Sequence, residues 1–350
     1  MIGGISMLQS IMVSPGKIEF REVEKPILKP GQVLVKIMRI GICGSDIHVN
    51  HGKHPFTKYP VTQGHEVSGK IVQVSEEVNH LKIGQKITIE PQVVCGKCYP
   101  CRTGKYNLCE ELKVMGFQTV GAGSEFFAVD AKNVTPVPDH LSYDEAAMIE
   151  PLAVNVHAVN RVGDVKDKDI VVIGAGPIGI LLVQTLKAKG ARKVMVTDIS
   201  DYRLELAQKC NADFVINTKN EDFKEAMLRC FGPDKADIIY DCAGNNITMG
   251  QAIRHSRKGS IIVLVAVFDG MATVDLATLN DKELDLYTSM MYRHEDYLEA
   301  IELVEAGKVN LKPLMSKHFA FRDWEKAYEY IDNNYETTMK VLIDVNNDED

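Results

Sequence analysis

Four cysteines fall within the fifteen-residue segment CGKCYPCRTGKYNLC, a density that points to a metal site. They are Cys95, Cys98, Cys101 and Cys109, separated by two, two and seven residues. Clustered thiols in a chain without a secretion signal usually hold a metal, and four thiolates form the closed tetrahedral shell of a structural zinc. The alternative is a set of unrelated buried cysteines. A filled shell leaves zinc no open position, so we expect this loop to stabilise the fold and not to bind a substrate.

A second set of possible metal ligands and proton-transfer groups is spread over the segments GICGSDIH, GHE and IEPLAV. The residues concerned are Cys43, Ser45, Asp46, His48, His65, Glu66 and Glu150. Taken singly, each also has a structural explanation, as a small core residue, a satisfied buried polar group or a solvated helix cap. Together with a nicotinamide site they gain weight, because hydride transfer from an alcohol needs an electrophile and a route for the proton.

The segment DIVVIGAGPIG predicts such a nicotinamide site. Gly174, Gly176 and Gly179 follow a buried-type strand and open a helix, the context in which G-x-G-x-x-G binds a pyrophosphate. Asp198 ends the next strand, where a carboxylate accepts hydrogen bonds from a ribose 2′-hydroxyl and so favours NAD over NADP. Arg203 lies close enough in sequence to touch the adenosine, and an arginine also tolerates a 2′-phosphate. The full set of predicted cofactor contacts is Gly174, Gly176, Pro177, Ile178, Gly179, Asp198, Arg203 and Val265.

The chain contains residue types that could supply both the electrophile and the proton route that alcohol oxidation requires. Zinc held by three protein groups keeps a fourth position open, and coordination lowers the pKa of a hydroxyl there, as it does for water, from ~15.7 to about 7. A hydroxyl such as that of Ser45, two residues from a cysteine ligand, can accept the alcohol proton. A histidine such as His48, with an ordinary pKa of ~6.5, can pass it to solvent.

Composition excludes several other classes of protein. The formal net charge of −8 argues against non-specific nucleic-acid binding, which needs a cationic surface. There is no run of eighteen apolar residues to cross a membrane. The amino-terminal segment MIGGISMLQSIMV has neither a basic start nor a long apolar core, so we expect no signal peptide and a cytoplasmic protein. At 350 residues, two domains are expected.

The pattern of predicted secondary structure changes near Leu152. Before it, short runs such as QVLVKIMRI, VSGKIVQV, QKITIE and SEFFAV predict a largely antiparallel β region. After it, strand-like segments (DIVVIG, KVMVTD, FVI, DIIYDCAG, SIIVLVAV, ELDLYTSM) alternate with helix-length ones, which indicates an α/β fold with a parallel sheet covered by helices. Beyond Met291 we expect a helix over 295–306, a strand over 318–321, a helix from Arg322 and a final strand, MKVLID.

These motifs together resemble the zinc-containing medium-chain dehydrogenases, essentially from end to end. The matching elements are GICGSDIH, GHE, the four-cysteine loop, EPLAVNVHA, and GAGPIG followed by Asp198. Glu-Pro-Leu at Glu150 and serine at Ser45 are similar to the sorbitol and butanediol dehydrogenase branch. The resemblance implies a doubly wound Rossmann domain over 154–291, inserted into a mostly β, GroES-like catalytic domain over 1–153 and 292–350.

The resemblance also implies roles for individual residues. Cys43, His65 and Glu66 would hold a catalytic zinc, with Glu150 as a direct or water-linked ligand that exchanges with Glu66. Asp46 would orient a ligand. The proton would pass from substrate to Ser45 and, through the cofactor ribose, to His48. The second zinc would be the structural one in the four-cysteine loop. A homodimer or homotetramer is expected on the same basis.

The expected reaction is NAD-dependent oxidation of a secondary hydroxyl of a polyol or sugar acid to a ketone. The cationic loop HGKHPFTKYP and Arg293 favour a carboxylate-bearing substrate, although solvated surface or subunit contacts would explain these side chains equally well. Butanediol and L-threonine 3-dehydrogenases are the closest alternatives, the latter usually with threonine at the Ser45 position. A non-catalytic cofactor-binding relative would lack a zinc ligand or the proton relay, and neither is missing here.

Overall fold

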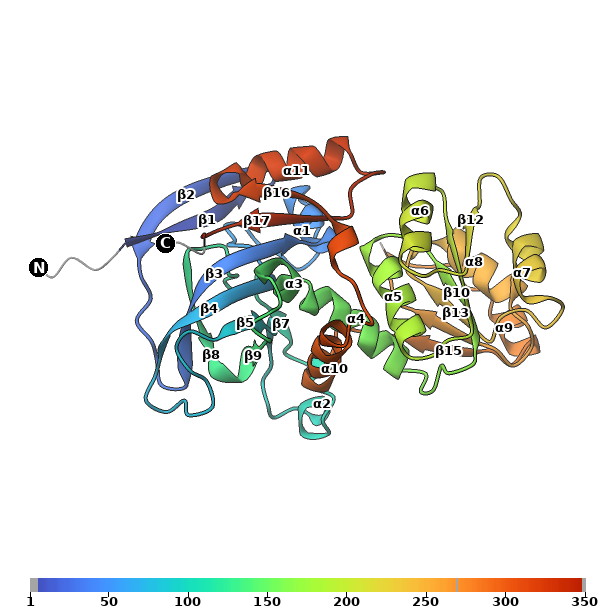
Figure 1. Ribbon diagram of the computed structural model, residues 1–350, viewed down its shortest axis with the longest axis horizontal. Helices are drawn as coiled ribbons and strands as arrows, with labels where there is room; N and C mark the ends of the chain where they lie inside the picture. The colour runs from blue at the N-terminus through green and yellow to red at the C-terminus, as the bar shows by residue number, and fades with distance from the viewer. Residues whose placement is uncertain (1–5, 269, 348–350) are drawn as a thin grey trace, which may run out of the picture. The chain divides into compact units, whose positions relative to one another are not determined.

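The computed structural model describes residues 6–268 and 270–347, which form two compact units. The first unit comprises Met1–Glu150 and Leu314–Asp350, and the second comprises Pro151–Pro313. Figure 1 colours them along the chain, with the second unit inserted between the two segments of the first. The first five and last three residues of the predicted catalytic domain lie outside the described residues. In the described part of the chain no helix combines the length and apolar character that a membrane crossing requires.

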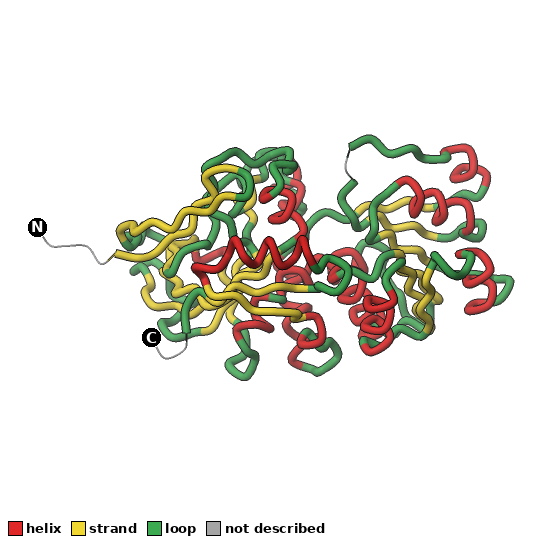
Figure 2. Tube along the Cα trace, turned by 90° about the horizontal axis from the view of Figure 1, so that it is seen from above, coloured by secondary structure: helices red, strands yellow, loops and turns green. Residues whose placement is uncertain are grey.

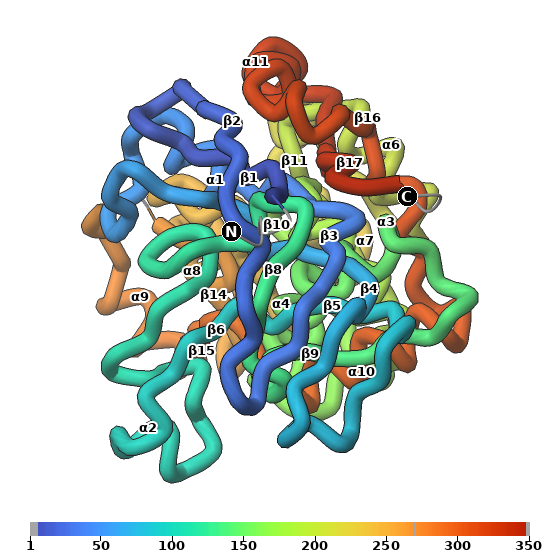
Figure 3. The backbone as a smooth tube through the Cα atoms, turned by 90° about the vertical axis from the view of Figure 1, so that its left-hand side faces the viewer, coloured from blue at the N-terminus to red at the C-terminus, as the bar shows by residue number. Residues whose placement is uncertain are grey.

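The first unit is built on a seven-stranded, mostly antiparallel sheet whose path runs β16-β17-β3-β4-β5-β9. β17 pairs with the carboxyl-terminal half of β3, and β8 pairs with its amino-terminal half (Figure 3). The strands are β3 (Gln32–Ile42), β4 (Glu66–Val74), β5 (Lys86–Ile89), β8 (Phe126–Asp130), β9 (Val134–Pro136), β16 (Met315–Ala320) and β17 (Lys340–Asp344). The four β-rich runs chosen from the sequence correspond to β3, β4, β5 and β8.

A core of branched aliphatic side chains packs against this sheet. Val33, Val35 and Ile37 of β3 are fully buried, and Leu34 between them is buried too, so this central strand is covered on both faces. The amphipathic helix α11 (Trp324–Asn333) buries Trp324 and Tyr328, one turn apart, and belongs to the same core. Figure 2 shows this helix lying across the strands of the first unit.

Several short elements complete the first unit. The hairpin of β1 and β2 was not predicted, although KIEFREVE alternates polar and apolar residues as a strand does. The remaining elements are β1 (Ser6–Ser14), β2 (Lys17–Glu24), α1 (Gly44–Asn50), β6 (Gln92–Val93), α2 (Tyr99–Arg102), β7 (Lys113–Val114) and α3 (Tyr143–Ala147), with 3₁₀ helices at Tyr106–Leu108, Ala131–Asn133, Lys312–Leu314 and Phe321–Asp323.

The second unit contains a six-stranded, fully parallel sheet in the order β12-β11-β10-β13-β14-β15. This is the doubly wound order 3-2-1-4-5-6, in which the winding reverses between β10 and β13. β10 is buried at every position, as expected for a central strand covered on both faces. The strands are β10 (Asp169–Ile173), β11 (Lys193–Asp198), β12 (Phe214–Asn217), β13 (Ile238–Asp241), β14 (Ile261–Leu264) and β15 (Asp285–Thr288).

The helices of the second unit include one that we had expected in the catalytic domain. They are α4 (Ile149–Asn160), α5 (Pro177–Ala188), α6 (Asp201–Lys209), α7 (Phe223–Phe231), α8 (Asn246–His255), α9 (Leu276–Asp281) and α10 (His294–Glu305). The structure moves the second domain boundary from 292 to 313/314, so α10 groups with the second unit. The first boundary shifts only from 153 to 150.

Buried polar contacts between α10 and α4 explain this correction. Asp296 is fully buried, and its carboxylate contacts His157 Nδ1 at 2.8 Å and Asn160 Nδ2 at 3.1 Å. Burial opposes the charge, but the bonds to His157 and to the Arg293 backbone N–H outweigh it, and the pKa of Asp296 is lowered. A buried carboxylate with these partners ties the two helices together in a way that sequence patterning does not reveal.

Replacing Asp296 by alanine should therefore destabilise the second unit. We expect Asp296→Ala to cost about 3 kcal/mol at pH 7, because His157 and Asn160 lose a buried, charge-assisted partner. Since the folded pKa is depressed, this contribution is present above the unfolded value of ~3.9 and is lost as pH falls through the folded pKa. Urea unfolding of the full-length protein at several pH values would measure it.

Glu302→Ala is the matched control, because Glu302 is an exposed carboxylate on the same helix. It should change the free energy of unfolding by no more than about 0.5 kcal/mol. Equal effects of the two substitutions would contradict the account of α10.

Candidate functional site

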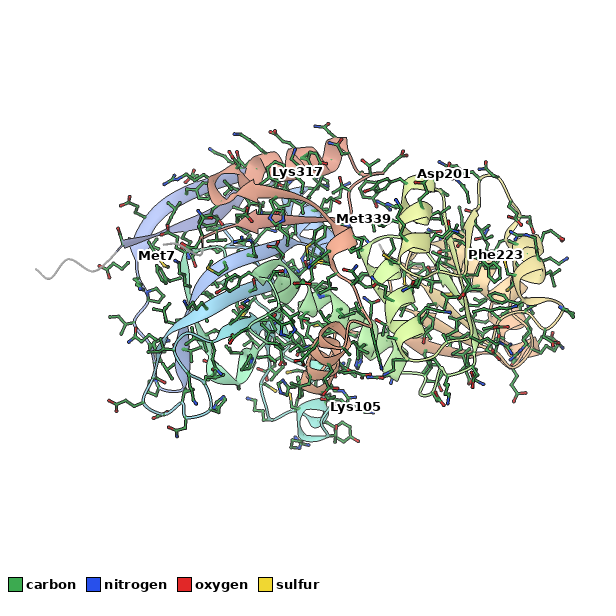
Figure 4. The ribbon with its side chains drawn as sticks, viewed as in Figure 1. Met7, Lys105, Asp201, Phe223, Lys317 and Met339 are labelled. Atoms are coloured by element: carbon green, nitrogen blue, oxygen red, sulfur yellow. The ribbon has the colours of Figure 1, made fainter. Side chains whose placement is uncertain are left out.

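The four cysteines of the loop converge as their spacing predicts. Their sulfur atoms all lie within 4.8 Å of one another, and Cys98 Sγ is 3.9 Å from Cys109 Sγ. Cys98 caps α2, and the antiparallel pair β6–β7 closes the base of the loop. Lys105, labelled in Figure 4, lies on the same loop.

The surroundings of these thiols suit a metal cation. The backbone N–H of Cys98 points at Cys95 Sγ and that of Cys95 at Cys109 Sγ. Backbone N–H groups of Glu110 and Cys101 lower the pKa of Cys98 to about 6, which favours the thiolate. Four convergent thiols of this kind are the donor set of a closed zinc site, so the residues fit the metal that the sequence implied.

The second group forms where two neighbouring strands meet. β3 ends at Ile42 and β4 begins at Glu66, and their antiparallel register places Gly41 opposite Glu66. Cys43 and His65 are the next residues outward on each side, so ligand atoms of Cys43, His65 and Glu66 lie within 4.8 Å of one another. Gly41 is required here, because a Cβ would overlap the Glu66 carboxylate.

A buried lysine that the sequence analysis missed completes this group. Lys340 Nζ lies 2.6 and 2.7 Å from the two carboxylate oxygens of Glu66, and both residues are at most 3% exposed. β17 pairs with β3 so that Val341 lies opposite Ile42, and Lys340 therefore falls opposite Cys43. The sequence feature that could have revealed this residue is a lysine at the start of the mostly apolar strand KVLID. Figure 4 labels Met339, the residue before it.

The electrostatics of the group favour a cation. Burial opposes the charge on Lys340, but Glu66, Cys43 and Glu150 raise its pKa above the ordinary value. Burial likewise opposes the charge on His65, but Asp46 and Cys43 raise its pKa well above normal. The negative groups that raise these pKa values would also attract a metal ion, so this site too fits zinc.

His65 is held in an orientation suited to a ligand. Its Nδ1 lies 3.5 Å from Asp46 Oδ2, which leaves Nε2 for a metal. The ring also packs on Phe117, with ring centroids 4.9 Å apart. Asp46 sits in the first turn of α1 and accepts from the Cys43 backbone N–H at 3.0 Å. The predicted orienting role of Asp46 thus has a geometric basis.

The other predicted residues of this site lie on two helices. Ser45 and His48 are three residues apart on α1, where they share a face; Ser45 is half-buried and His48 is exposed. Glu150 is buried in the first turn of α4 and contributes to the field at Lys340. It is not among the ligand atoms that converge with Cys43, so the structure brings Glu66, and not Glu150, into this group.

The dinucleotide motif has the local geometry that its glycines imply. Gly174 follows β10 with a φ of +98°, a conformation that favours glycine. Gly176 caps α5, whose first residue is Pro177, followed by Ile178. A Cβ on Gly176 would meet nothing within 4 Å, whereas one on Gly179 would overlap the Gly174 carbonyl oxygen. The space above Gly176 is what close approach of a pyrophosphate needs.

Asp198 lies at the carboxyl end of β11 with its carboxylate fixed by backbone. Oδ2 accepts from Ala175 N at 2.7 Å, and Oδ1 accepts from Ile199 N at 2.7 Å and Ser200 N at 2.9 Å. Arg203 is in the first turn of α6, and Val265 follows β14. All of these residues lie at the carboxyl edge of the parallel sheet, where such folds bind their ligands.

The residues proposed to attract a carboxylate are partly engaged by near neighbours. Arg293 precedes α10 and forms an ion pair with Glu295 at 3.1 Å. In the loop after α1, His51 contacts Asp332 at 3.0 Å. His54 contacts Thr57 and stacks on Phe117, and burial lowers the pKa of His54. Lys53 and Lys58 are exposed.

The two glycines give a matched pair of substitutions. Gly176→Ala should leave folding intact and weaken NAD binding about tenfold or more, because its methyl group occupies only the space that the pyrophosphate needs. Gly179→Ala should destabilise the second unit by about 2 kcal/mol through overpacking. Calorimetric NAD titration and thermal unfolding separate the two effects, and normal NAD affinity in Gly176→Ala would contradict the assigned site.

Lys340→Met should show how the buried ion pair and the metal share Glu66. Without metal, the substitution leaves a buried carboxylate unpaired and should cost about 3 kcal/mol. With zinc bound, the metal can compensate the charge, so the loss should be smaller by about 1 kcal/mol or more. Thermal unfolding of zinc-loaded and chelator-treated protein would measure both values, with the exposed Lys326→Met as control. Equal losses would contradict a shared carboxylate.

Comparison with known proteins identifies the family of this chain. Residues 29–139 match the family model described as an alcohol dehydrogenase GroES-like domain, and residues 177–306 match that of a zinc-binding dehydrogenase. L-threonine 3-dehydrogenase from Pyrococcus horikoshii is 33% identical, covering 92% of this chain and 94% of its own. L-idonate 5-dehydrogenase from Vitis vinifera is 34% identical, over 87% of this chain and 86% of its own.

A solved structure supports the same conclusion. An alcohol dehydrogenase from Escherichia coli CFT073, crystallised with NADH, superposes with a TM-score of 0.91 at 30% identity, over 98% of this chain and all of that one. The predicted fold class is thereby confirmed, as are an oxidoreductase acting on CH–OH groups and the zinc and nicotinamide cofactors. The chain belongs to the zinc-containing medium-chain dehydrogenases, in their polyol dehydrogenase branch.

Proposed function

We propose that this protein oxidises a secondary hydroxyl of a polyol or sugar acid to a ketone, with NAD as hydride acceptor. The observation that carries the proposal is the convergence of Cys43, His65 and Glu66 in a chain whose other unit bears a dinucleotide fingerprint with Asp198. Such a set of three ligands leaves zinc a position for substrate, unlike the four-thiol loop.

In this proposal Cys43, His65 and Glu66 hold the catalytic zinc, and Cys95, Cys98, Cys101 and Cys109 hold the structural one. When bound, the catalytic zinc would supply a Lewis acid that lowers the pKa of the substrate hydroxyl. Glu66 would be the resting carboxylate ligand, a choice supported by the closeness of its carboxylate to the ligand atoms of Cys43 and His65. Glu150, buried close to Lys340, would exchange with it.

The chain's own residues would then carry the proton away. Ser45 Oγ would accept the proton of the substrate hydroxyl as it gives up its own hydroxyl proton toward His48, and His48, exposed on the same face of α1, would release a proton to solvent. A half-buried hydroxyl followed by an exposed imidazole suits a path from a protected site to water. Asp198, with both oxygens fixed by backbone N–H groups, would bind the adenosine ribose and favour NAD.

The substrate class is supported by two observations. The plant L-idonate dehydrogenase to which the chain is similar acts, by its name, on a sugar acid. Serine at Ser45 also separates this chain from the usual threonine dehydrogenase pattern. L-threonine 3-dehydrogenase is the second candidate, favoured by the similarity to the Pyrococcus horikoshii protein. Because Arg293 and His51 already pair with carboxylates, Lys53 and Lys58 are the more available cations for a sugar-acid substrate.

We also propose a homodimer or homotetramer located in the cytoplasm. Among the described residues, β15 is hydrogen-bonded along one edge only, and Leu286 of this strand is 41% exposed. Val267, Met271 and Leu276, from the segment before it, are also exposed. An unpaired strand edge with apolar neighbours suits pairing with a second copy. The eight cysteines form no disulfide among the described residues, which suits a reducing compartment.

Steady-state NAD reduction should distinguish the candidate substrates. We expect turnover of at least one of sorbitol, xylitol, idonate, gulonate and galactonate to exceed turnover of 2,3-butanediol and L-threonine by about tenfold or more in kcat/KM. Preference for L-threonine would support the second candidate. Preference for uncharged polyols, with no loss in Arg293→Ala, Lys53→Ala or Lys58→Ala, would contradict a sugar-acid substrate.

Chelation and a ligand variant are the controls for this assay. Removing metal should abolish NAD reduction, and activity that survives complete metal removal would overturn the mechanism. Cys43→Ser should lose activity while its unfolding transition stays near wild type. Unfolding of Cys43→Ser would instead show that the two zinc sites had been assigned the wrong way round.

A further inference from the structure

A buried chain of polar contacts leads from His65 away from the ligand group and into the core of the first unit. Asp46 Oδ2 lies 3.5 Å from His65 Nδ1, and Asp46 Oδ1 accepts from Gln63 Nε2 at 3.2 Å. Gln63 Oε1 accepts in turn from the Tyr328 hydroxyl at 2.8 Å. These four side chains are at most 5% exposed, so the chain is shielded from water throughout.

The neighbours of Gln63 fix the direction of its amide. Asp46 presents only acceptors to it, a carboxylate oxygen at 3.2 Å and its own backbone carbonyl at 3.3 Å, so the NH₂ group must face Asp46. The opposite orientation would place the amide oxygen against a buried carboxylate. Burial raises the pKa of Tyr328 well above the ordinary tyrosine value, so the hydroxyl keeps its proton and donates to Oε1.

The two oxygens of Asp46 have separate partners as a result. Oδ2 accepts from Cys43 N at 3.0 Å and faces His65, whereas Oδ1 accepts from Gln63. Loss of the amide would deprive the buried Oδ1 of this donor and free the carboxylate to rotate about its broad terminal torsion. His65 Nδ1 would then lose the fixed carboxylate that faces it at 3.5 Å.

The orientation of the Asp46 carboxylate also affects Nε2, on the opposite side of the His65 imidazole ring. An acceptor at Nδ1 fixes both the tautomer and the ring angle, and so determines where Nε2 points. Outer partners of metal-binding histidines commonly change metal affinity by about 10- to 100-fold when they are removed.

We propose that Gln63 and Tyr328 are positioning residues for His65, which act through Asp46 to orient the imidazole and slow the loss of metal from the Cys43–His65–Glu66 group. This inference rests on the proposed function, since it takes that group as the catalytic metal site. Tyr328 is supplied by α11, so the carboxyl-terminal helix would help to retain the metal held at the ends of β3 and β4.

The test is the rate at which the zinc-loaded, full-length protein releases metal to an excess of a chromophoric chelator. We expect one zinc equivalent to leave about tenfold faster in Gln63→Met and about threefold faster in Tyr328→Phe, with the other equivalent unchanged. The double variant should be no faster than Gln63→Met alone, because both residues act along one chain. Tyr330→Phe is the matched control on the same helix and should release both equivalents at the wild-type rate.

A second readout separates positioning from general destabilisation. With cobalt in place of zinc, the visible absorption of the ligand group should shift in Gln63→Met and Tyr328→Phe but not in Tyr330→Phe. Wild-type release rates in both variants, or equal acceleration of both zinc equivalents, would overturn the inference. Should Cys43→Ser still retain two zinc equivalents, the catalytic metal assignment itself would fail, which is a different outcome.

Discussion

The buried ion pair between Lys340 and Glu66 constrains the whole first unit. Two charges removed from water are tolerable only when each finds a partner, and here the ammonium contacts both oxygens of one carboxylate. Lys340 belongs to β17, the last strand of the chain, whereas Glu66 opens β4. The carboxyl-terminal segment must therefore return to the sheet after the second unit, and its pairing with β3 brings the lysine to the ligand group.

The donor sets of the two candidate metal-binding groups suit one for a structural role and the other for chemistry. In the loop closed by β6 and β7, four thiols converge and leave a zinc ion no free position. At the ends of β3 and β4, a thiol, an imidazole and a carboxylate converge, and the carboxylate is shared with a lysine. Strand ends are suitable places for such a site, because the strand register fixes which residues meet there.

Motifs with local causes could be found from the sequence, and tertiary partners could not. The cysteine loop and the glycines of the dinucleotide motif depend on local backbone geometry. The four sulfur atoms converge, and the glycines have the conformation and close contacts that the motif predicts. Lys340, Gln63 and Tyr328 depend on strand register and helix packing between segments more than 250 residues apart, as the Gln63–Tyr328 bond shows with a separation of 265. The grouping of α10 with the second unit was not predicted for the same reason, because it depends on the buried contact of Asp296 with His157.

The central claim is that this chain holds two zinc ions, one in each of the two groups. Anomalous X-ray diffraction at the zinc edge, from crystals of the full-length protein grown with zinc and NAD, tests it most directly. We expect two peaks, one among Cys95, Cys98, Cys101 and Cys109 and one among Cys43, His65 and Glu66. A single peak confined to the four-cysteine loop, in crystals saturated with zinc, would contradict the account.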